Sequence, residues 1–212
     1  MPTSTSLAAF ALIALAMVLT PGPNMIYLLS RSILQGRAAG FISLLGVILG
    51  FFVYMVGAVL GLTGVLLAVP LVYEAIQWAG AVYLLWLAWT AIRPGARSVL
   101  GPRRDLPHDG AQRLFTMGLV TNLLNPKIAV LYLSLLPQFV DPGHGAALGQ
   151  FIILGLVQIA VSFSVNLTIV LLAGVIAGWL AARPGWLTLQ RWLMGGILAA
   201  LATRLVLERR AA

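Results

Sequence analysis

Long stretches without any charged residue run through this sequence, and they limit the folds that the chain can adopt. Residues 1–30, 38–73, 75–92 and 142–182 contain no Asp, Glu, Lys or Arg. Only 8% of all residues are charged and 61% are hydrophobic, whereas about 25% of the residues of a soluble domain are charged. So few charges do not cover the surface of a soluble domain of this size. The chain is therefore expected to fold inside a lipid bilayer.

The apolar stretches predict an all-α integral membrane protein that forms one membrane domain over residues 1–212. A membrane-spanning helix takes roughly 20 residues. We predict six transmembrane helices, at about residues 7–30, 39–66, 72–92, 114–139, 147–179 and 187–207. The fifth is long for one span, and its polar segment at 162–168 leaves open a division into two shorter helices.

The basic residues predict the orientation of the chain, because cytoplasmic loops are enriched in Lys and Arg. With six spans and an external N-terminus, nine bases fall on the inner side: Arg31, Arg37, Arg93, Arg97, Arg103, Arg104, Arg113, Arg183 and Arg191. The outer side keeps only Arg204, Arg209 and Arg210. We therefore predict that both termini lie outside and that residues 93–113 form a cytoplasmic loop.

Proline interrupts two of the predicted helices near their middle. The residues of the two interruptions are Pro21, Gly22, Pro23 and Asn24 in the first helix and Asn122, Asn125, Pro126 and Lys127 in the fourth. Proline lacks a backbone donor and clashes with the carbonyl group four residues earlier. The interruptions are about half a chain apart, so each half has three helices with the break in its first. Because three is odd, the halves at about 7–92 and 114–207 run in opposite directions, as the inverted repeats of secondary transporters do.

Each interruption starts a new half-helix within the membrane, and these two N-termini predict a binding site. A helix N-terminus carries unpaired N–H groups and the positive end of the helix dipole. Asn125 is a good N-cap, with Pro126 at the first helical position. With Lys127 beside it, such an end favours an anionic group, for example a carboxylate. The eight residues of the two interruptions are therefore the candidate substrate-binding residues. The alternatives are that the prolines only kink packed helices and that Lys127 pairs with a helix C-terminus.

Other residue patterns suggest how the helices pack and how transport is coupled. Gly40, Gly46 and Gly50 in the second helix allow another helix to approach closely, within one chain or in a homodimer. If a carboxyl group carries a coupled proton, Glu74 or Asp141 is the candidate, because both lie near the predicted outer face. The substrate, water or Lys127 are the other possible carriers of that proton.

The sequence has no pattern typical of a catalytic or metal site. It lacks cysteine, helical clusters of Asp, Glu or His, and G-x-S-x-G, H-E-x-x-H or P-loop motifs. We therefore predict no enzyme activity, no metal and no cofactor. The bases lie in short clusters between apolar runs, so no nucleic-acid partner is expected. An ion or metal carrier and a membrane scaffold subunit without its own substrate are the alternatives to an exporter of small molecules.

Three segments resemble the LysE/RhtB family of amino-acid exporters. They are TPGPNMIYLLSRSILQGRAAGFISLLGVILG at 20–50, WAGAVYLLWLAWTAIR at 78–93 and FTMGLVTNLLNPKIAVLYLSLLPQFV at 115–140. The resemblance implies six helices in the inner membrane of a bacterium, efflux of amino acids or related metabolites, and coupling to the proton-motive force. Members often have a polar residue directly after the glycine at position 50 and another a few positions later, where this chain has Phe51 and Tyr54. That departure argues against a basic or strongly polar substrate, so a neutral amino acid is expected.

The predicted orientation can be tested by labelling, because the chain contains no cysteine of its own. We expect a cysteine at Ser98 to be shielded from a membrane-impermeant thiol reagent in intact cells and to react after the cells are opened. A cysteine at Gly143 should react in intact cells. The opposite labelling pattern would overturn both the orientation and the inverted-repeat prediction that uses it.

Overall fold

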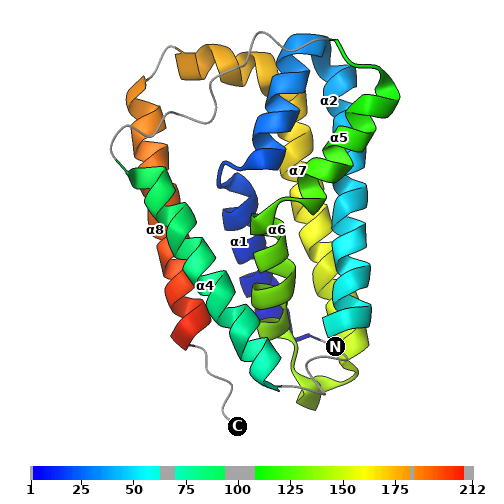
Figure 1. Ribbon diagram of the computed structural model, residues 1–212, viewed down its shortest axis with the longest axis vertical. Coiled ribbons are helices and arrows are strands. Elements are labelled where there is room, and N and C mark those ends of the chain that lie inside the picture. Colours follow the sequence, from blue (N-terminus) through cyan, green and yellow to red (C-terminus); the bar gives the residue numbers. More distant parts are fainter. Residues whose placement is uncertain (1, 63–69, 94–107, 182–183, 208–212) are drawn as a thin grey trace.

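The computed structural model describes residues 2–62, 70–93, 108–181 and 184–207, which are predominantly helical and contain no β-strand (Figure 1). The elements are α1 (Ser4–Leu19), α2 (Pro23–Gly57), the π-helical segment η1 (Ala58–Leu62), α4 (Pro70–Ile92), α5 (Ala111–Leu123), α6 (Pro126–Val130), the π-helical η2 (Leu131–Leu135), the 3-10 helices η3 (Leu136–Phe139) and η4 (Pro142–His144), α7 (Ala147–Ala181) and α8 (Pro184–Leu207). The prediction of an all-helical fold is confirmed.

The predicted boundary between the first two helices lies inside α2, at Gly36. This glycine has φ 86° and ψ 173°, and it divides α2 at a kink. Residues with a side chain rarely adopt a positive φ, whereas glycine does so at little cost. The expected helix at 7–30 therefore corresponds to α1 and the first part of α2, with a break between them at residues 20–22.

The second predicted interruption is also present, whereas the fifth predicted helix is continuous. Helix α5 and the segment Pro126–Phe139 are bent by 50° relative to each other. Helix α7 runs over 35 residues without a break, so the alternative of two shorter helices is wrong. The polar side chains of its middle segment bond within the helix: Ser164 and Thr168 each donate to the carbonyl group four residues earlier.

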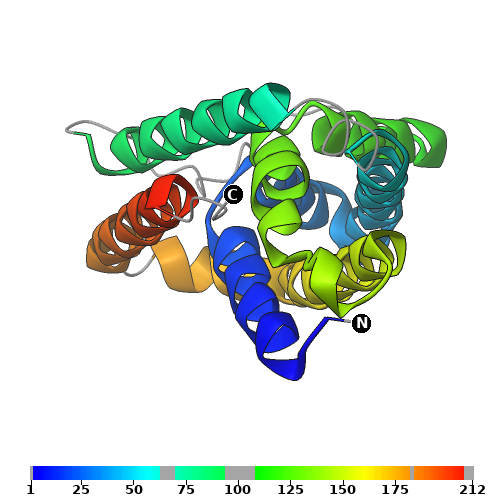
Figure 2. The same cartoon turned by 90° about the horizontal axis from the view of Figure 1, so that it is seen from below.

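The helices are arranged so that the two interrupted ones meet near the centre of the structure. Helices α4 and α8 pack together on one side, and α2 packs with α5 and α7 on the other. Helices α1 and α6 lie between these two groups (Figure 1), and the view from below places them next to each other (Figure 2). The breaks that end α1 and begin α6 therefore lie inside the fold.

Glycines bring α2 and α5 unusually close to each other. A Cβ atom added to Gly46 would overlap the backbone of Phe115, and one added to Gly118 would overlap the carbonyl oxygen of Ser43. Gly50 lies against the side chain of Asn122. Gly40, by contrast, lies against Ser32 of its own helix and Val170 of α7. Small residues at these positions permit backbone-to-backbone contact between helices.

The surface of the described residues is strongly apolar. Leu12, Val82 and Trp89 are among many large hydrophobic side chains that are exposed. Two helical stretches, Pro23–Gly61 and Ala147–Ile176, are each long and apolar enough to cross a membrane, and the bent α5–α6 pair is a third candidate. These features fit a membrane protein. The six-span inverted repeat stays a prediction, and most of the predicted cytoplasmic loop lies outside the described residues.

A buried ion pair joins α2 to the segment that precedes α5. The Arg31 guanidinium lies 2.7 Å from the Asp109 carboxylate, and the two side chains are only 4% and 2% exposed. Gln35 donates to the Asp109 carbonyl oxygen at 3.0 Å, and the Tyr27 hydroxyl donates to the Leu114 carbonyl oxygen at 2.8 Å. Arg113 also contacts Asp109, at 3.1 Å, but its side chain is 67% exposed. These contacts hold the first part of α2 against α5.

This ion pair predicts a difference in stability between two variants. Removing one partner of a buried pair leaves a buried charge without its counter-charge and costs about 3–5 kcal/mol. We expect Asp109→Asn to lower the thermal unfolding midpoint of the detergent-purified protein clearly. Arg113→Gln removes only the exposed contact, worth at most about 1 kcal/mol, and serves as the matched control. Equal midpoints for the two variants would show that the Arg31–Asp109 pair does not hold the helices together.

Candidate functional site

The end of α1 is determined by proline. In a continuous helix, the N–H group of residue 21 would donate to the carbonyl oxygen of Met17, but Pro21 has no N–H group. Helix α1 ends at Leu19 with Thr20 as its C-cap, and α2 begins at Pro23 after Gly22 in an extended conformation. The break therefore leaves carbonyl groups at the end of α1 that need donors from elsewhere.

The second break has the capping arrangement expected from its sequence. The Asn125 side-chain oxygen accepts a hydrogen bond from the backbone N–H of Lys127 at 3.1 Å, with Pro126 at the start of α6. The Tyr54 hydroxyl donates to the Leu123 carbonyl oxygen near the end of α5 at 2.8 Å. Both ends of this break thus receive a side-chain partner.

Lys127 connects the two breaks. Its ammonium group donates to the carbonyl oxygen atoms of Met17 at 2.9 Å and of Thr20 at 2.6 Å, and the residue is only 6% exposed. A cation at a helix C-terminus interacts favourably with the helix dipole. Gly22 makes room for it, because a Cβ atom there would lie 3.0 Å from the Lys127 Nζ atom. The geometry thus contains the contact with a helix C-terminus that the sequence left open.

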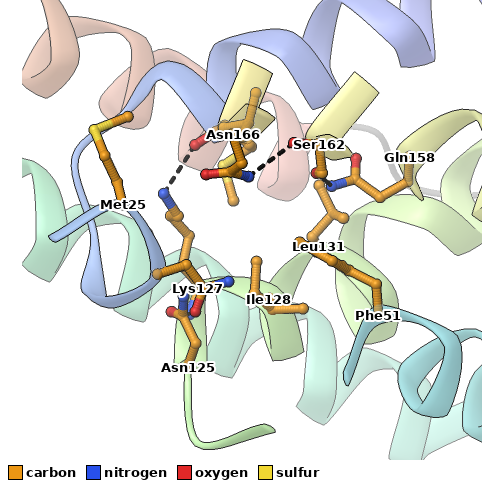
Figure 3. Close-up of a pocket in the computed structure, with 12 residues that line it drawn as sticks. Met25, Phe51, Asn125, Lys127, Ile128, Leu131, Gln158, Ser162 and Asn166 are labelled. Carbon is orange, nitrogen blue, oxygen red and sulfur yellow. Dashed lines mark hydrogen bonds between the residues drawn. The ribbon is translucent and has the colours of Figure 1, made fainter. Parts of the chain in front are cut away.

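A small cavity lies beside this contact (Figure 3). Its volume is about 20 Å³, which is roughly the room that one water molecule needs. The lining comes from α1, α2, α6, η2 and α7. It consists of Met17, Val18, Asn24, Met25, Phe51, Asn125, Lys127, Ile128, Leu131, Gln158, Ser162 and Asn166. Among these described lining residues Lys127 is the one that is charged, and five others are polar and six are apolar.

The polar side chains of the cavity are not fully hydrogen-bonded. Gln158 donates to the Ser162 hydroxyl oxygen at 2.8 Å, and Asn166 donates to the Ser162 carbonyl oxygen at 2.8 Å. The Asn24 Oδ1, Gln158 Oε1 and Asn125 Nδ2 atoms are buried and have no hydrogen-bond partner among the described residues. More than about 90% of buried polar atoms in proteins have a partner. These three atoms in one cavity therefore have hydrogen-bonding capacity left for a ligand or for water.

The structure places the sequence-predicted site residues in two groups. Asn24, Asn125 and Lys127 line the cavity, whereas Pro21, Gly22, Pro23, Asn122 and Pro126 do not. The prolines and Gly22 shape the breaks, and Asn122 is fully buried against Gly50. Sequence reasoning had not placed Ser162 and Asn166 in the site, although the polar segment at 162–168 within an otherwise apolar helix was the available signal.

Of the two candidate acids for proton coupling, Asp141 is not among the residues that line this cavity. Asp141 is exposed; it accepts a hydrogen bond from the Gly143 N–H at 2.8 Å and contacts the His144 ring at 2.7 Å. The Gly143 bond and the His144 contact lower the pKa of this carboxyl group. The side chain of Glu74 lies outside the described part of the structure. No group of three or more His, Asp or Glu residues able to hold a metal occurs among the described residues.

Comparison with known proteins gives a consistent family. Residues 15–209 match the family described as LysE type translocator. The leucine efflux protein of Klebsiella pneumoniae is 28% identical over 91% of this chain and 90% of its own length. The homoserine/homoserine lactone efflux protein of Salmonella typhimurium is 30% identical over 90% of this chain and 94% of its own length. An uncharacterised membrane protein of Pseudomonas aeruginosa is 30% identical over 86% of this chain and 87% of its own length. No solved structure gave a significant match.

Proposed function

The chain belongs to the LysE type translocator family, and on that premise we propose that it is a secondary transporter that exports a neutral amino acid from the cytoplasm. The observation that carries the proposal is the cavity at the two helix breaks, where Lys127 is the only charged residue among the described residues of the lining. The names of the relatives, leucine efflux and homoserine/homoserine lactone efflux, support an amino acid or a related metabolite as the substrate.

The proposed binding group for the substrate carboxylate is the N-terminal end of α6. The Lys127 ammonium uses two of its three donors on carbonyl groups of α1, which leaves one donor for a ligand. The Asn125 Nδ2 atom is a second, unpaired donor in the same lining. A carboxylate here would receive charge-assisted hydrogen bonds, which are roughly twice as strong as neutral ones.

The proposed preference for a neutral side chain follows from the rest of the lining. Six of its twelve residues are apolar, including Met25, Phe51 and Leu131. The part of the lining that the structure describes contains no Asp or Glu that would pair with the side-chain cation of a basic amino acid. Burying such a cation without a partner is costly. We therefore propose an apolar amino acid such as leucine as the first substrate to test.

The proposal also includes the location and the mechanism. We propose a multi-pass protein of the bacterial inner membrane with both termini outside, built from two inverted repeats and driven by the proton-motive force. An amino acid is several times larger than the present cavity of about 20 Å³. Export therefore requires the helices around the breaks to move apart and to expose the site to one side of the membrane at a time.

Substitution of Lys127 tests the binding site. We expect Lys127→Met to abolish leucine efflux from dipeptide-fed cells of a host that lacks its own exporters. It also removes the donor for Met17 and Thr20, so a loss of stability of about 1–3 kcal/mol is expected. Lys127→Arg should keep a cation but retain little efflux, because its planar guanidinium does not occupy the place of a compact ammonium.

Binding separates a transport defect from an unfolded protein. The thermal unfolding midpoint of the purified parent should rise when leucine is added, because a ligand that binds only the folded state stabilises it. The Lys127→Met protein should unfold cooperatively without a leucine-dependent rise. Gln138→Met, outside the cavity lining, should behave as the parent does. A normal leucine response in Lys127→Met would reassign the lysine to a purely structural contact.

Proton coupling predicts different results for the two acids. Because its pKa is lowered and it is exposed, Asp141 stays ionised near neutral pH, so it is a poor proton carrier. We expect proteoliposomes with Asp141→Asn to keep leucine transport that depends on an imposed pH gradient. Glu74→Gln should lose this dependence if a carboxyl group is the carrier. Gradient-driven transport by the double variant would exclude both acids and leave the substrate, water or Lys127 as the carrier.

A further inference from the structure

The unpaired hydrogen-bond donors and the unpaired acceptors of the cavity come from different helices. The available donors, the Lys127 ammonium and the Asn125 Nδ2 atom, both come from the start of α6. The unpaired acceptors, Asn24 Oδ1 and Gln158 Oε1, come from α2 and α7. Donors and acceptors thus line one cavity but belong to different helices. This division matches a zwitterion, which needs donors for its carboxylate and acceptors for its ammonium.

We propose that Asn24 and Gln158 form a subsite for the α-ammonium group of the substrate, next to the carboxylate end at Lys127 and Asn125. The inference rests on the proposed function and adds the group that distinguishes an amino acid from other small carboxylates. An ammonium has three N–H donors, and two amide oxygens accept two of them. The transported species is then the free amino acid with both its charges.

The positions of the two acceptors fit this role. Gln158 is 1% exposed, and its Nε2 atom is bonded to Ser162 at 2.8 Å, so its oxygen is the end of the amide available for a ligand. Asn24 is 7% exposed and lies two residues after Gly22, which lies against the Lys127 ammonium. Figure 3 shows Lys127 and Gln158 reaching the cavity from different helices. Asn24 is thus close in sequence to Gly22, which lies by the Lys127 ammonium, and Gln158 reaches the cavity from α7.

A site that contains Lys127 requires uncharged acceptors for the ammonium group of the substrate. A carboxylate in place of either amide would attract the Lys127 ammonium and compete with the carboxylate of the substrate. Amide oxygens accept from an ammonium without this competition. The choice of amides also explains how a cavity whose described lining residues include no acid can bind an ammonium group.

The subsite predicts which analogues of leucine are rejected. The analogue 2-hydroxy-4-methylpentanoate keeps the carboxylate and the side chain of leucine but replaces the ammonium with a hydroxyl. It supplies one donor to two buried acceptors. An unmatched buried acceptor costs enough to reduce binding at least about tenfold. We expect the parent protein in proteoliposomes to exchange leucine at least tenfold faster than this hydroxy acid.

Two substitutions test the acceptors, and each result is read as a ratio within one vesicle preparation. Gln158→Met and Asn24→Leu should each lower the rate ratio of leucine to hydroxy acid toward 1. The ratio is independent of how much protein has folded. Gln158→Glu keeps an acceptor but introduces a carboxylate that competes for Lys127, so it should exchange leucine more slowly than the parent and accept leucinamide, a cation without a carboxylate, better than the parent does. Gln138→Met is the matched control, because the Gln138 oxygen is also unpaired but lies outside the cavity lining.

The outcomes separate the two proposals. If the parent exchanges leucine but the ratio is close to 1, or if neither Gln158→Met nor Asn24→Leu changes it, the ammonium subsite is wrong and the unpaired atoms bind water only. If the parent exchanges neither compound, the proposed function itself fails. A high parent ratio that falls in both variants and not in Gln138→Met supports the subsite.

Discussion

The fold around the site depends on one interaction, the Lys127 ammonium bonded to two carbonyl groups at the end of α1. A lone charge inside a membrane protein is costly, and so is a carbonyl group without a donor. Here the Lys127 ammonium and the carbonyl groups at the end of α1 are hydrogen-bonded to each other, so neither is left without a partner. Pro21 removes the N–H group that would pair with the Met17 carbonyl oxygen, and Lys127 supplies a donor to that oxygen at 2.9 Å. The sequence motifs of the two halves, PGPN and NPK, are therefore parts of a single contact, although more than 100 residues separate them.

The cavity beside this contact is bounded on another side by the continuous helix α7. Helices α1 and α2 are separated by one break, and α5 and α6 by the other, whereas α7 passes the cavity unbroken. Gln158, Ser162 and Asn166 are four residues apart along α7 and so lie on one face of the helix. Their hydrogen bonds within α7 fix the side chains before any ligand arrives. One helix thus presents a polar face whose side chains are held by hydrogen bonds, next to two breaks in the neighbouring helices.

The sequence predicted the parts of this arrangement that depend on local chemistry. The proline and glycine residues predicted the position of both breaks. The Asn125–Pro126 pair predicted the N-cap of α6, which is Asn125. Three features were beyond it, because each depends on how distant helices meet. The sequence left two partners open for Lys127, an anion and a helix C-terminus, and only the packing of α1 against α6 shows that carbonyl groups take two of its donors. Asp109 falls within the predicted cytoplasmic loop at 93–113, whereas it forms a buried pair with Arg31. Ser162 and Asn166 line the cavity because α7 faces the breaks, and the polar segment at 162–168 alone does not show which helices it faces.

Under the proposed function, the carbonyl groups of α1 and the substrate carboxylate use the same Lys127 donors, and this couples ligand binding to helix movement. Two of its three donors hold α1 in the present conformation, in which the cavity is too small for an amino acid. A carboxylate attracts the ammonium more strongly than neutral carbonyl groups do, so it competes with the end of α1 for the same donors. Any donor that moves to the substrate leaves a carbonyl group of Met17 or Thr20 unpaired, which favours movement of α1 away from α6. Release of the substrate reverses the exchange. The lysine would then act both as a binding group and as the link through which occupancy of the site changes the distance between the two broken helices.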